Sequence, residues 1–209
     1  PCCLVGSEMC IRDSDRLTQF QTQCLWLLHG GPGTGKSHVI KLIKEDFFEQ
    51  RLGYVAGTDF QVVALQAVNA EAINGDTIHH ALGLRPFTSA SNNKNKNDAD
   101  GPSEQAAKLV SQWKWLIIDE ISMVSVQFLA QLDTHLRAIM TQASSMKKDA
   151  DNIDRPYGGI NILFCGDFCQ LDPPTGTGIA KMPTAYISRS RQYASGQLEE
   201  HGQHIFWGG

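Results

Sequence analysis

The amino-acid sequence predicts an α/β fold in which a parallel sheet is covered by helices on both faces. Four short apolar runs alternate with longer amphipathic segments, which is the order of strands and helices that such a fold requires. The runs are almost continuously hydrophobic, as strands buried on both faces are. With 209 residues, of which 42% are hydrophobic and 19% charged, the chain is long enough for one such domain with a sizeable core.

The four predicted strands end where polar or glycine-containing stretches begin. They are CLWLL at 24–28, FQVVAL at 60–65, WLIID at 115–119 and INILFC at 160–165. Because the carboxyl ends of parallel strands meet at one edge of a sheet, residues that follow these runs are expected to lie close together.

Two segments between the runs have the apolar spacing of helices. In 37–50, Val39, Ile43 and Phe47 recur every four residues with Ile40 beside them, and predict one buried face. In 125–140 a second stripe is predicted to be buried, consisting of Leu129, Leu132, Leu136 and Ile139.

Three other segments lack this spacing. Residues 1–14 resemble translated adapter read-through, and we predict that they are a non-native leader before a single domain at 15–209. They have neither the basic start nor the apolar core of a signal peptide. Residues 88–105 are polar and Asn-rich, which predicts a surface insertion or a disordered loop. Residues 175–209 show no clear periodicity and predict an irregular tail.

The composition of the chain bears on whether it contacts a membrane, binds nucleic acid or contains disulfides. No apolar run approaches the ~18 residues of a membrane helix, so no contact with a membrane is expected. The net charge of −4 gives no overall signal for nucleic acid, so such a site must be a local groove. The six cysteines form no CxxC pair, which favours free thiols in a reducing compartment over a disulfide or metal site. We therefore expect an intracellular protein, in the nucleus or mitochondrion of a eukaryote or otherwise in the cytoplasm.

The stretch GGPGTGKS at 30–37, called the phosphate loop below, predicts an ATP site. It matches G-x-x-x-x-G-K-[ST] between a predicted strand and a predicted helix, which is the context that this motif requires. Its lysine is expected to reach the β- and γ-phosphates and its serine to ligate Mg²⁺. The alternative, a Gly-rich turn without function, does not need the Lys-Ser pair. The predicted ATP-binding residues are Gly30, Gly31, Pro32, Gly33, Thr34, Gly35, Lys36, Ser37 and His38.

Two acids end the strand at 115–119. Asp119 is predicted to hold Mg²⁺, and Glu120 to orient and deprotonate the attacking water. The alternative is a solvated helix N-cap. Trp113 and Trp115 flank this strand, and are predicted to pack in the core rather than to stack on bases.

The stretch CGDFCQLDPP at 165–174 follows the fourth strand. A turn has no need of a glutamine, but a neutral amide at this edge of the sheet can detect a terminal phosphate by hydrogen bonding. Gln170 is therefore predicted to contact the γ-phosphate or its water, as a catalytic residue beside Lys36 and Glu120. The two prolines are predicted to stiffen the chain beyond it.

Four stretches in this order resemble the amino-terminal motor domain of the Pif-family DNA helicases of superfamily one, type B. They are GGPGTGKS, NGDTIHHALGL, LIIDEISMV and ILFCGDFCQLDPP, and the resemblance covers roughly 22–175. It implies a P-loop NTPase with a RecA-like sheet, and Mg²⁺–ATP hydrolysis coupled to 5′-to-3′ movement on single-stranded DNA. It also supports Lys36, Ser37, Asp119, Glu120 and Gln170 in the roles given above.

The resemblance further implies a DNA path along 66–70 and 75–80. Its contact candidates are Gln66, Thr77 and His79, although a structural role of His79 and His80 as a hydrogen-bonded pair of loop residues is an equal alternative. Where the family usually has Thr-Gly, this chain has Gln66-Ala67. The glutamine that reads adenine in the family has no assigned counterpart.

The second RecA-like domain of the family, which supplies an arginine to the γ-phosphate, is expected to be missing from this chain. On its own the chain is therefore expected to bind nucleotide, hydrolyse it slowly and unwind nothing. Two alternatives stay open: a non-catalytic nucleotide-binding switch, and another RecA-type P-loop ATPase that acts on RNA or protein. The switch is disfavoured because a protein that only binds nucleotide needs neither Glu120 nor Gln170. The other ATPase is disfavoured because we do not expect such a protein to carry both of the stretches DEISMV and GDFCQL.

Overall fold

In a computed structural model, which describes residues 22–83, 104–149, 151–181 and 194–207, five strands form one parallel sheet in the order β1-β5-β4-β2-β3. The strands are β1 (Leu25–His29), β2 (Phe60–Ala64), β3 (Asp76–Thr77), β4 (Trp115–Asp119) and β5 (Asn161–Gly166). The four predicted strands are thus confirmed to within one residue at each end, and the short β3 is additional. The leader at 1–14 lies outside the described residues.

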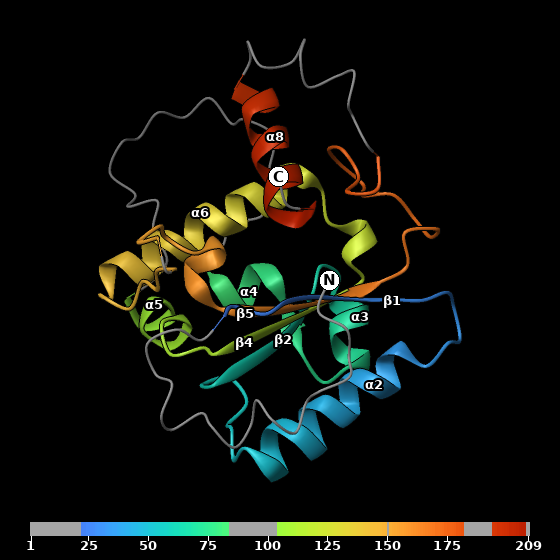
Figure 1. Cartoon of the computed structure of the whole chain (residues 1–209). Coiled ribbons are helices and arrows are strands. Elements are labelled where there is room, and N and C mark those ends of the chain that lie inside the picture. The colour runs from blue at the N-terminus through green and yellow to red at the C-terminus, as the bar shows by residue number, and fades with distance from the viewer. Residues whose placement is uncertain (1–21, 84–103, 150, 182–193, 208–209) are drawn as a thin grey trace.

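Helices lie on both sides of the sheet (Figure 1). They are α2 (Lys36–Leu42), η1 (Ile43–Arg51), α3 (Ala67–Ala72), α4 (Ile78–Leu82), α5 (Glu104–Val110), η2 (Ile121–Met123), α6 (Val126–Gln142), η3 (Pro156–Gly159) and α8 (Ala194–Trp207). The predicted insertion at 88–105 lies outside the described residues except for its last two, which begin α5. Within the described part of the chain, no helix is long and apolar enough to cross a membrane.

Each face of the sheet has its own hydrophobic core, because neighbouring residues of a strand point to opposite sides. In β4, Leu116 and Ile118 join the core beneath α4, α5, α6 and α8, whereas Ile117 joins the core beneath α2, η1 and α3. The predicted stripe of α6 is buried as expected, at Leu129, Leu132, Leu136 and Ile139. The predicted α/β architecture with helices on both faces is therefore confirmed.

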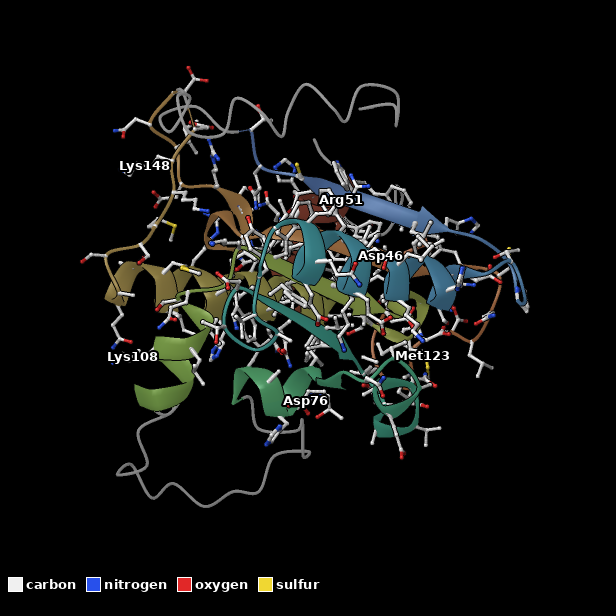
Figure 2. The ribbon with its side chains drawn as sticks, turned by 90° about the horizontal axis from the view of Figure 1, so that it is seen from below. Asp46, Arg51, Asp76, Lys108, Met123 and Lys148 are labelled. Carbon is white, nitrogen blue, oxygen red and sulfur yellow. The ribbon has the colours of Figure 1, made fainter. Side chains whose placement is uncertain are left out.

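The helix after the phosphate loop buries most of the face that its spacing predicts: Ile40 is fully buried, and Ile43 and Phe47 are partly buried against the core. Its second part, η1, is a π-helix, and it lies across the sheet in the view from below, where Asp46 and Arg51 are labelled (Figure 2). Two residues depart from the prediction: Val39 is 37% exposed in α2, and Phe48, which the spacing did not include, is fully buried in η1. Hydrogen bonds from residue i to i+5 widen the turns of η1, which brings Phe48 onto the inward face.

The two tryptophans beside β4 pack as predicted. Trp113 is buried, and its indole N–H donates to the Gly57 carbonyl at 3.0 Å. The ring of Trp115 lies 5.5 Å from Phe48 and 5.4 Å from Trp26, measured between centroids. Both indole rings thus pack against other residues of the domain, as predicted, rather than forming a platform for stacking on bases.

The tail at 175–209 is not irregular as predicted, because it contains α8, which packs on α6 (Figure 1). The Trp207 indole N–H donates to the Ile179 carbonyl at 3.1 Å. A Cβ atom at Gly202 would collide with the Val126 carbonyl oxygen of α6, so the two helices meet where α8 has no side chain. These contacts join parts of the chain that are distant in sequence. The spacing of apolar residues within α8 therefore did not predict a helix there.

Strand β1 is less buried than its apolar sequence predicts. Among the described residues it pairs only with β5, and it forms an edge of the sheet (Figure 1). Leu25, Trp26 and Leu27 are 37%, 44% and 42% exposed. An edge strand lacks a neighbour on one side, and apolar edge strands are templates for pairing with another chain.

We expect the chain to self-associate through β1, and Leu27→Lys to weaken that association about tenfold, because a charged lysine disfavours edge pairing and removes an apolar contact. Sedimentation velocity over a range of protein concentrations measures the association constant. Ile153→Lys is the matched control, since Ile153 is 62% exposed in the loop before β5. Equal association constants for the Leu27 variant and the wild type would contradict the prediction.

Candidate nucleotide-binding site

The phosphate loop leaves β1 through a turn that requires glycine. Gly33 and Gly35 have φ angles of 73° and 90°, in the left-handed region where any side chain is strained. Lys36 folds back over this turn, and its Nζ donates to the carbonyl oxygens of Gly30 at 2.6 Å and Gly31 at 3.0 Å. The loop thus fixes the ammonium group beside the backbone at its own start.

A helix begins directly at the end of the loop. The Val39 N–H donates to the Gly35 carbonyl at 3.0 Å, which closes the first helical turn. Ser37 and His38 are exposed in that turn, and the Thr34 hydroxyl donates to the Gly31 carbonyl at 2.8 Å. The unpaired N–H groups of a helix start attract anions, so the loop and helix together suit a phosphate group.

The two predicted acids lie at the carboxyl end of β4. Asp119 is buried and accepts a hydrogen bond from the Glu120 N–H at 2.9 Å. Glu120 has φ 54° and ψ 48°, a left-handed conformation that is uncommon for residues other than glycine. It precedes η2, but its side chain makes no capping hydrogen bond there, which disfavours the solvated N-cap.

The charges of these side chains act on one another. Burial raises the pKa of the Asp119 carboxyl, and the Glu120 N–H and the charge of Lys36 partly oppose this. Burial and the neighbouring Asp119 raise the pKa of Glu120, Lys36 opposes them, and Asp167 adds to the rise. The structure therefore brings one lysine and three carboxyl groups together at one edge of the sheet.

Gln170 lies in the turn that follows β5, next to the strand that leads into the phosphate loop. The Gly30 N–H donates to the Gly166 carbonyl at 3.2 Å, so the ends of β1 and β5 meet. Beyond Gly166 the chain turns, and the Gln170 N–H donates to the Asp167 carbonyl at 3.1 Å. The Gln170 side chain is exposed at the same edge of the sheet as Lys36.

Sequence reasoning missed Asp167, which is only 2% exposed. Its Oδ1 accepts a hydrogen bond from the Cys169 N–H at 2.9 Å, and its charge reaches Glu120. A Gly-Asp pair after a strand also suits an ordinary turn, so the sequence did not distinguish it from one. Its position beside Gln170 in GDFCQL was the available signal.

The residues present fit the Mg²⁺ that the phosphate loop implies. Ser37 offers a hydroxyl oxygen and Asp119 a carboxylate oxygen, which are the hard donors that Mg²⁺ prefers beside phosphate and water. Burial disfavours the charged form of Asp119, and a bound cation would stabilise that form. Ser37 and Asp119 would therefore hold the ion.

We expect Asp119→Asn to raise the melting temperature at pH 7 by about 2–4 °C while removing Mg²⁺-dependent nucleotide binding. Because the pKa of Asp119 is raised in the folded state, the folded protein binds this proton more tightly than the unfolded chain does. Its contribution to stability is complete at low pH and is lost as the pH rises through the folded-state pKa. Asparagine removes the buried charge.

Thermal unfolding without Mg²⁺ between pH 4 and pH 8 tests this expectation. The difference in melting temperature between Asp119→Asn and wild type should grow with pH. Asp46→Asn, an exposed change on η1, serves as the control. If Asp119→Asn melts below wild type at pH 7, the assignment of a destabilising buried charge is wrong.

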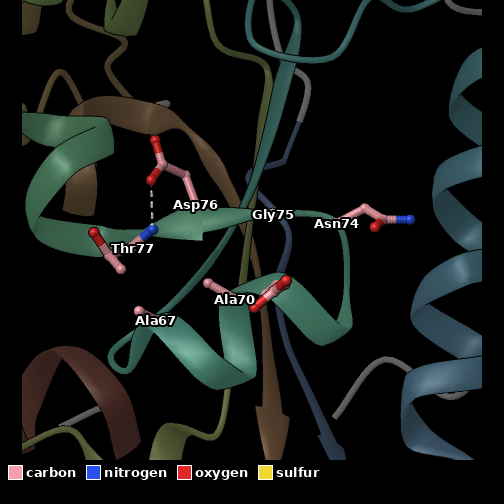
Figure 3. Close-up of a pocket in the computed structure, with 7 residues that line it drawn as sticks. Ala67, Ala70, Asn74, Gly75, Asp76 and Thr77 are labelled. Atoms are coloured by element: carbon pink, nitrogen blue, oxygen red, sulfur yellow. Dashed lines mark hydrogen bonds between the residues drawn. The ribbon is translucent and has the colours of Figure 1, made fainter.

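The predicted DNA-contact residues lie at the ends of β2 and β3. Gln66 is exposed immediately before α3, and the Thr77 hydroxyl accepts a hydrogen bond from the His80 N–H at 3.3 Å as the cap of α4. A shallow hollow of about 360 Å³ lies beside them (Figure 3). It is lined by Ala67, Ala70, Glu71, Asn74, Gly75, Asp76 and Thr77.

The alternative of a hydrogen-bonded loop pair at His79 and His80 is confirmed only in part. Both residues lie in α4, where each has its own partner. His79 packs on Phe128 with a centroid distance of 5.2 Å, and burial lowers its pKa. His80 instead bonds to Asp76 through its Nδ1 atom, and the hydrogen bond and charge of Asp76 raise its pKa. His79 is thus partly a packing residue.

Comparison with known proteins identifies the family. The family model of the PIF1-like helicase matches residues 14–198. The chain belongs to the PIF1-like helicase family. The resemblance that the sequence motifs indicated is therefore confirmed.

The curated relatives of this PIF1-like helicase chain are much longer than it is. ATP-dependent DNA helicase PIF1 of Danio rerio is 31% identical over 170 residues, which cover 77% of this chain and 22% of that protein. The Saccharomyces cerevisiae (strain YJM789) protein of the same name is 30% identical over 177 residues, covering 80% and 17%. This chain thus spans about a fifth of the length of these relatives.

Solved structures show the same fold. Pif1 helicase from Candida albicans superposes with a TM-score of 0.52 at 26% identity, covering 73% of this chain and 31% of that one. Pif1 helicase from Bacteroides, in complex with ADP-AlF3 and single-stranded DNA, has a TM-score of 0.56 at 23% identity, covering 92% and 37%. The sheet described above is thus the RecA-like sheet of a P-loop NTPase, as predicted.

Proposed function

We propose that this chain is the ATP-binding motor domain of a DNA helicase. In the longer protein it couples Mg²⁺–ATP hydrolysis to 5′-to-3′ movement along single-stranded DNA and to unwinding of the duplex. The observation that carries the proposal is the cluster of Lys36, Asp119 and Glu120 at the carboxyl edge of the sheet, in a chain of the PIF1-like helicase family. Its curated relatives carry the name of ATP-dependent DNA helicases.

Within this proposal each residue has one task. Lys36 and the N–H groups of the phosphate loop bind the β- and γ-phosphates, and Ser37 and Asp119 hold the Mg²⁺, which neutralises charge on the phosphates when it is bound. Glu120 takes a proton from the attacking water. The raised pKa of Glu120 supports this role, because a base works best when its pKa lies near the working pH. Gln170 contacts the γ-phosphate.

Single-stranded DNA is proposed to pass over the surface of α3 and α4. Thr77 lines the hollow between α3 and β3, Gln66 directly precedes its lining residue Ala67, and His79 follows Thr77 by two residues in α4. These residues lie at the carboxyl ends of β2 and β3, and the nucleotide site lies at the carboxyl end of β4, which pairs with β2. DNA and nucleotide would therefore bind along the same edge of one sheet.

The second RecA-like domain is a further proposed partner, because the relatives are several times longer than this chain. An arginine supplied to the γ-phosphate from outside a nucleotide-binding domain accelerates hydrolysis by ~10³–10⁵. The isolated chain is accordingly proposed to bind ATP and to turn it over slowly. The proposed location is the nucleus or mitochondrion in a eukaryote, and otherwise the cytoplasm.

ATP turnover with and without single-stranded DNA, in a protein extended to the second domain, tests the proposal. Stimulation by single-stranded DNA supports the helicase. Binding of nucleotide without turnover would favour the non-catalytic switch, and stimulation by RNA or protein alone would favour another RecA-type ATPase.

A further inference from the structure

A histidine connects the phosphate loop to the turn that carries Gln170. His29 is the last residue of β1, directly before the loop, and lies opposite Gly166 in the pairing of β1 with β5. Its ring stacks on Phe168, with centroids 5.5 Å apart and planes inclined by 19°. Any movement of Phe168 relative to the loop must therefore break this stack.

The same ring also binds the backbone of the turn. The Phe168 N–H donates to His29 Nε2 at 3.4 Å, which requires the tautomer that carries its proton on Nδ1. The Nε2 atom lies 3.7 Å from Oδ1 of Asp167, whose side chain is buried. One side chain thus contacts both residues at the start of the turn, where the chain leaves β5.

Phe168 also packs against two aromatic residues at the end of α8. The rings of Phe206 and Trp207 both lie 6.0 Å from Phe168, at interplanar angles of 89° and 42°. The hydrogen bond from Trp207 to the Ile179 carbonyl fixes this end of the helix. Phe168 therefore lies between α8 and His29, and His29 is the contact that adjoins the phosphate loop.

We propose that His29 is a positioning residue that sets the place of Gln170 relative to the phosphate loop. Gln170 lies two residues beyond Phe168, and its N–H donates to the Asp167 carbonyl, so the same turn carries both residues. His29 holds this turn at the distance from the loop at which the Gln170 amide meets a γ-phosphate. The inference rests on the proposed function, because it takes Gln170 as the group that detects ATP.

The test compares two nucleotides that differ in the γ-phosphate. Fluorescent Mg²⁺-bound AMP-PNP and ADP are titrated into the chain and into its His29→Ala variant, with Gln170→Ala as the reference for complete loss of detection. We expect the preference of His29→Ala for AMP-PNP over ADP to fall about three- to tenfold, since one stack and one hydrogen bond are lost. Its affinity for ADP and its melting temperature should stay near those of wild type.

Conservative variants separate positioning from folding. His29→Phe keeps a ring on Phe168, and His29→Gln keeps an acceptor near the position of Nε2. We expect at least one of them to recover part of the preference. His204→Ala, an exposed histidine of α8, is the matched control and should behave as wild type.

The inference fails if His29→Ala keeps the full preference while Gln170→Ala loses it, or if neither conservative variant recovers any of it. It fails also if wild type binds the two nucleotides equally, since there is then no detection to position. Failure of the proposed function looks different: wild type would bind neither nucleotide, or Lys36→Ala would bind both as wild type does.

Discussion

Replacement of Lys36 by alanine is expected to lower the affinity for Mg²⁺–ATP about 100-fold or more, which abolishes binding at ordinary protein concentrations. The ammonium group is held at the start of the phosphate loop by the carbonyls of Gly30 and Gly31. Hydrogen bonds from an ammonium group to phosphate oxygens contribute about 1.5–3 kcal/mol each, and Lys36 can donate more than one.

The variant also removes the cation that faces two acids. The charge of Lys36 lowers the pKa values of Asp119 and Glu120, so without it these carboxyl groups bind protons more readily and their negative charge repels the phosphates of the nucleotide more strongly. The loss of phosphate contacts and the loss of charge compensation thus both lower the affinity for Mg²⁺–ATP.

Titration with a fluorescent nucleotide measures the affinity. Lys41→Ala is the control, because Lys41 is an exposed lysine of the same helix whose partner, Glu45, lies 3.9 Å away on the surface. Undiminished affinity of the Lys36 variant, at an unchanged melting temperature, would remove the phosphate loop from the nucleotide site.

The sequence predicted the centre of the fold well because the strands there are buried on both faces. In β4, Leu116, Ile117 and Ile118 are all fully buried. A strand that is buried on both faces has a continuous apolar sequence, so it can be recognised from the sequence alone. The phosphate loop was equally readable, since Gly33 and Gly35 need backbone angles that only glycine adopts without strain.

Other features depend on contacts that a local pattern does not contain. The apolar run of β1 does not reveal that Trp26 lies on an edge strand, and the two residues of β3 are too few for a periodic signal. The predicted spacing assumes an α-helix throughout, whereas Phe48 is buried in a segment that is a π-helix. Asp167 was missed because its importance comes from burial beside Glu120, which only the fold creates.

Replacement of Glu120 by glutamine is expected to leave ATP bound but to lower turnover about 10²–10⁴-fold in the longer protein, the usual contribution of a general base. Glutamine has nearly the same shape, and the left-handed backbone of Glu120 places no new demand on it. An amide, however, does not take a proton from water.

The environment of Glu120 makes this carboxyl distinct from the others nearby. Burial, Asp119 and Asp167 all raise its pKa, and Lys36 lowers it, so its proton affinity depends on whether Lys36 is engaged by phosphate. A phosphate group that pairs with Lys36 would offset this lowering of the Glu120 pKa.

Single-turnover hydrolysis and nucleotide binding, measured on the same preparation, separate the two parts of this prediction. Glu49→Gln is the matched control, since Glu49 is exposed on η1 and remote in sequence from both acids. If the Glu120 variant hydrolyses ATP at the wild-type rate, another group takes the proton, and Asp167 is the buried carboxyl next to be replaced.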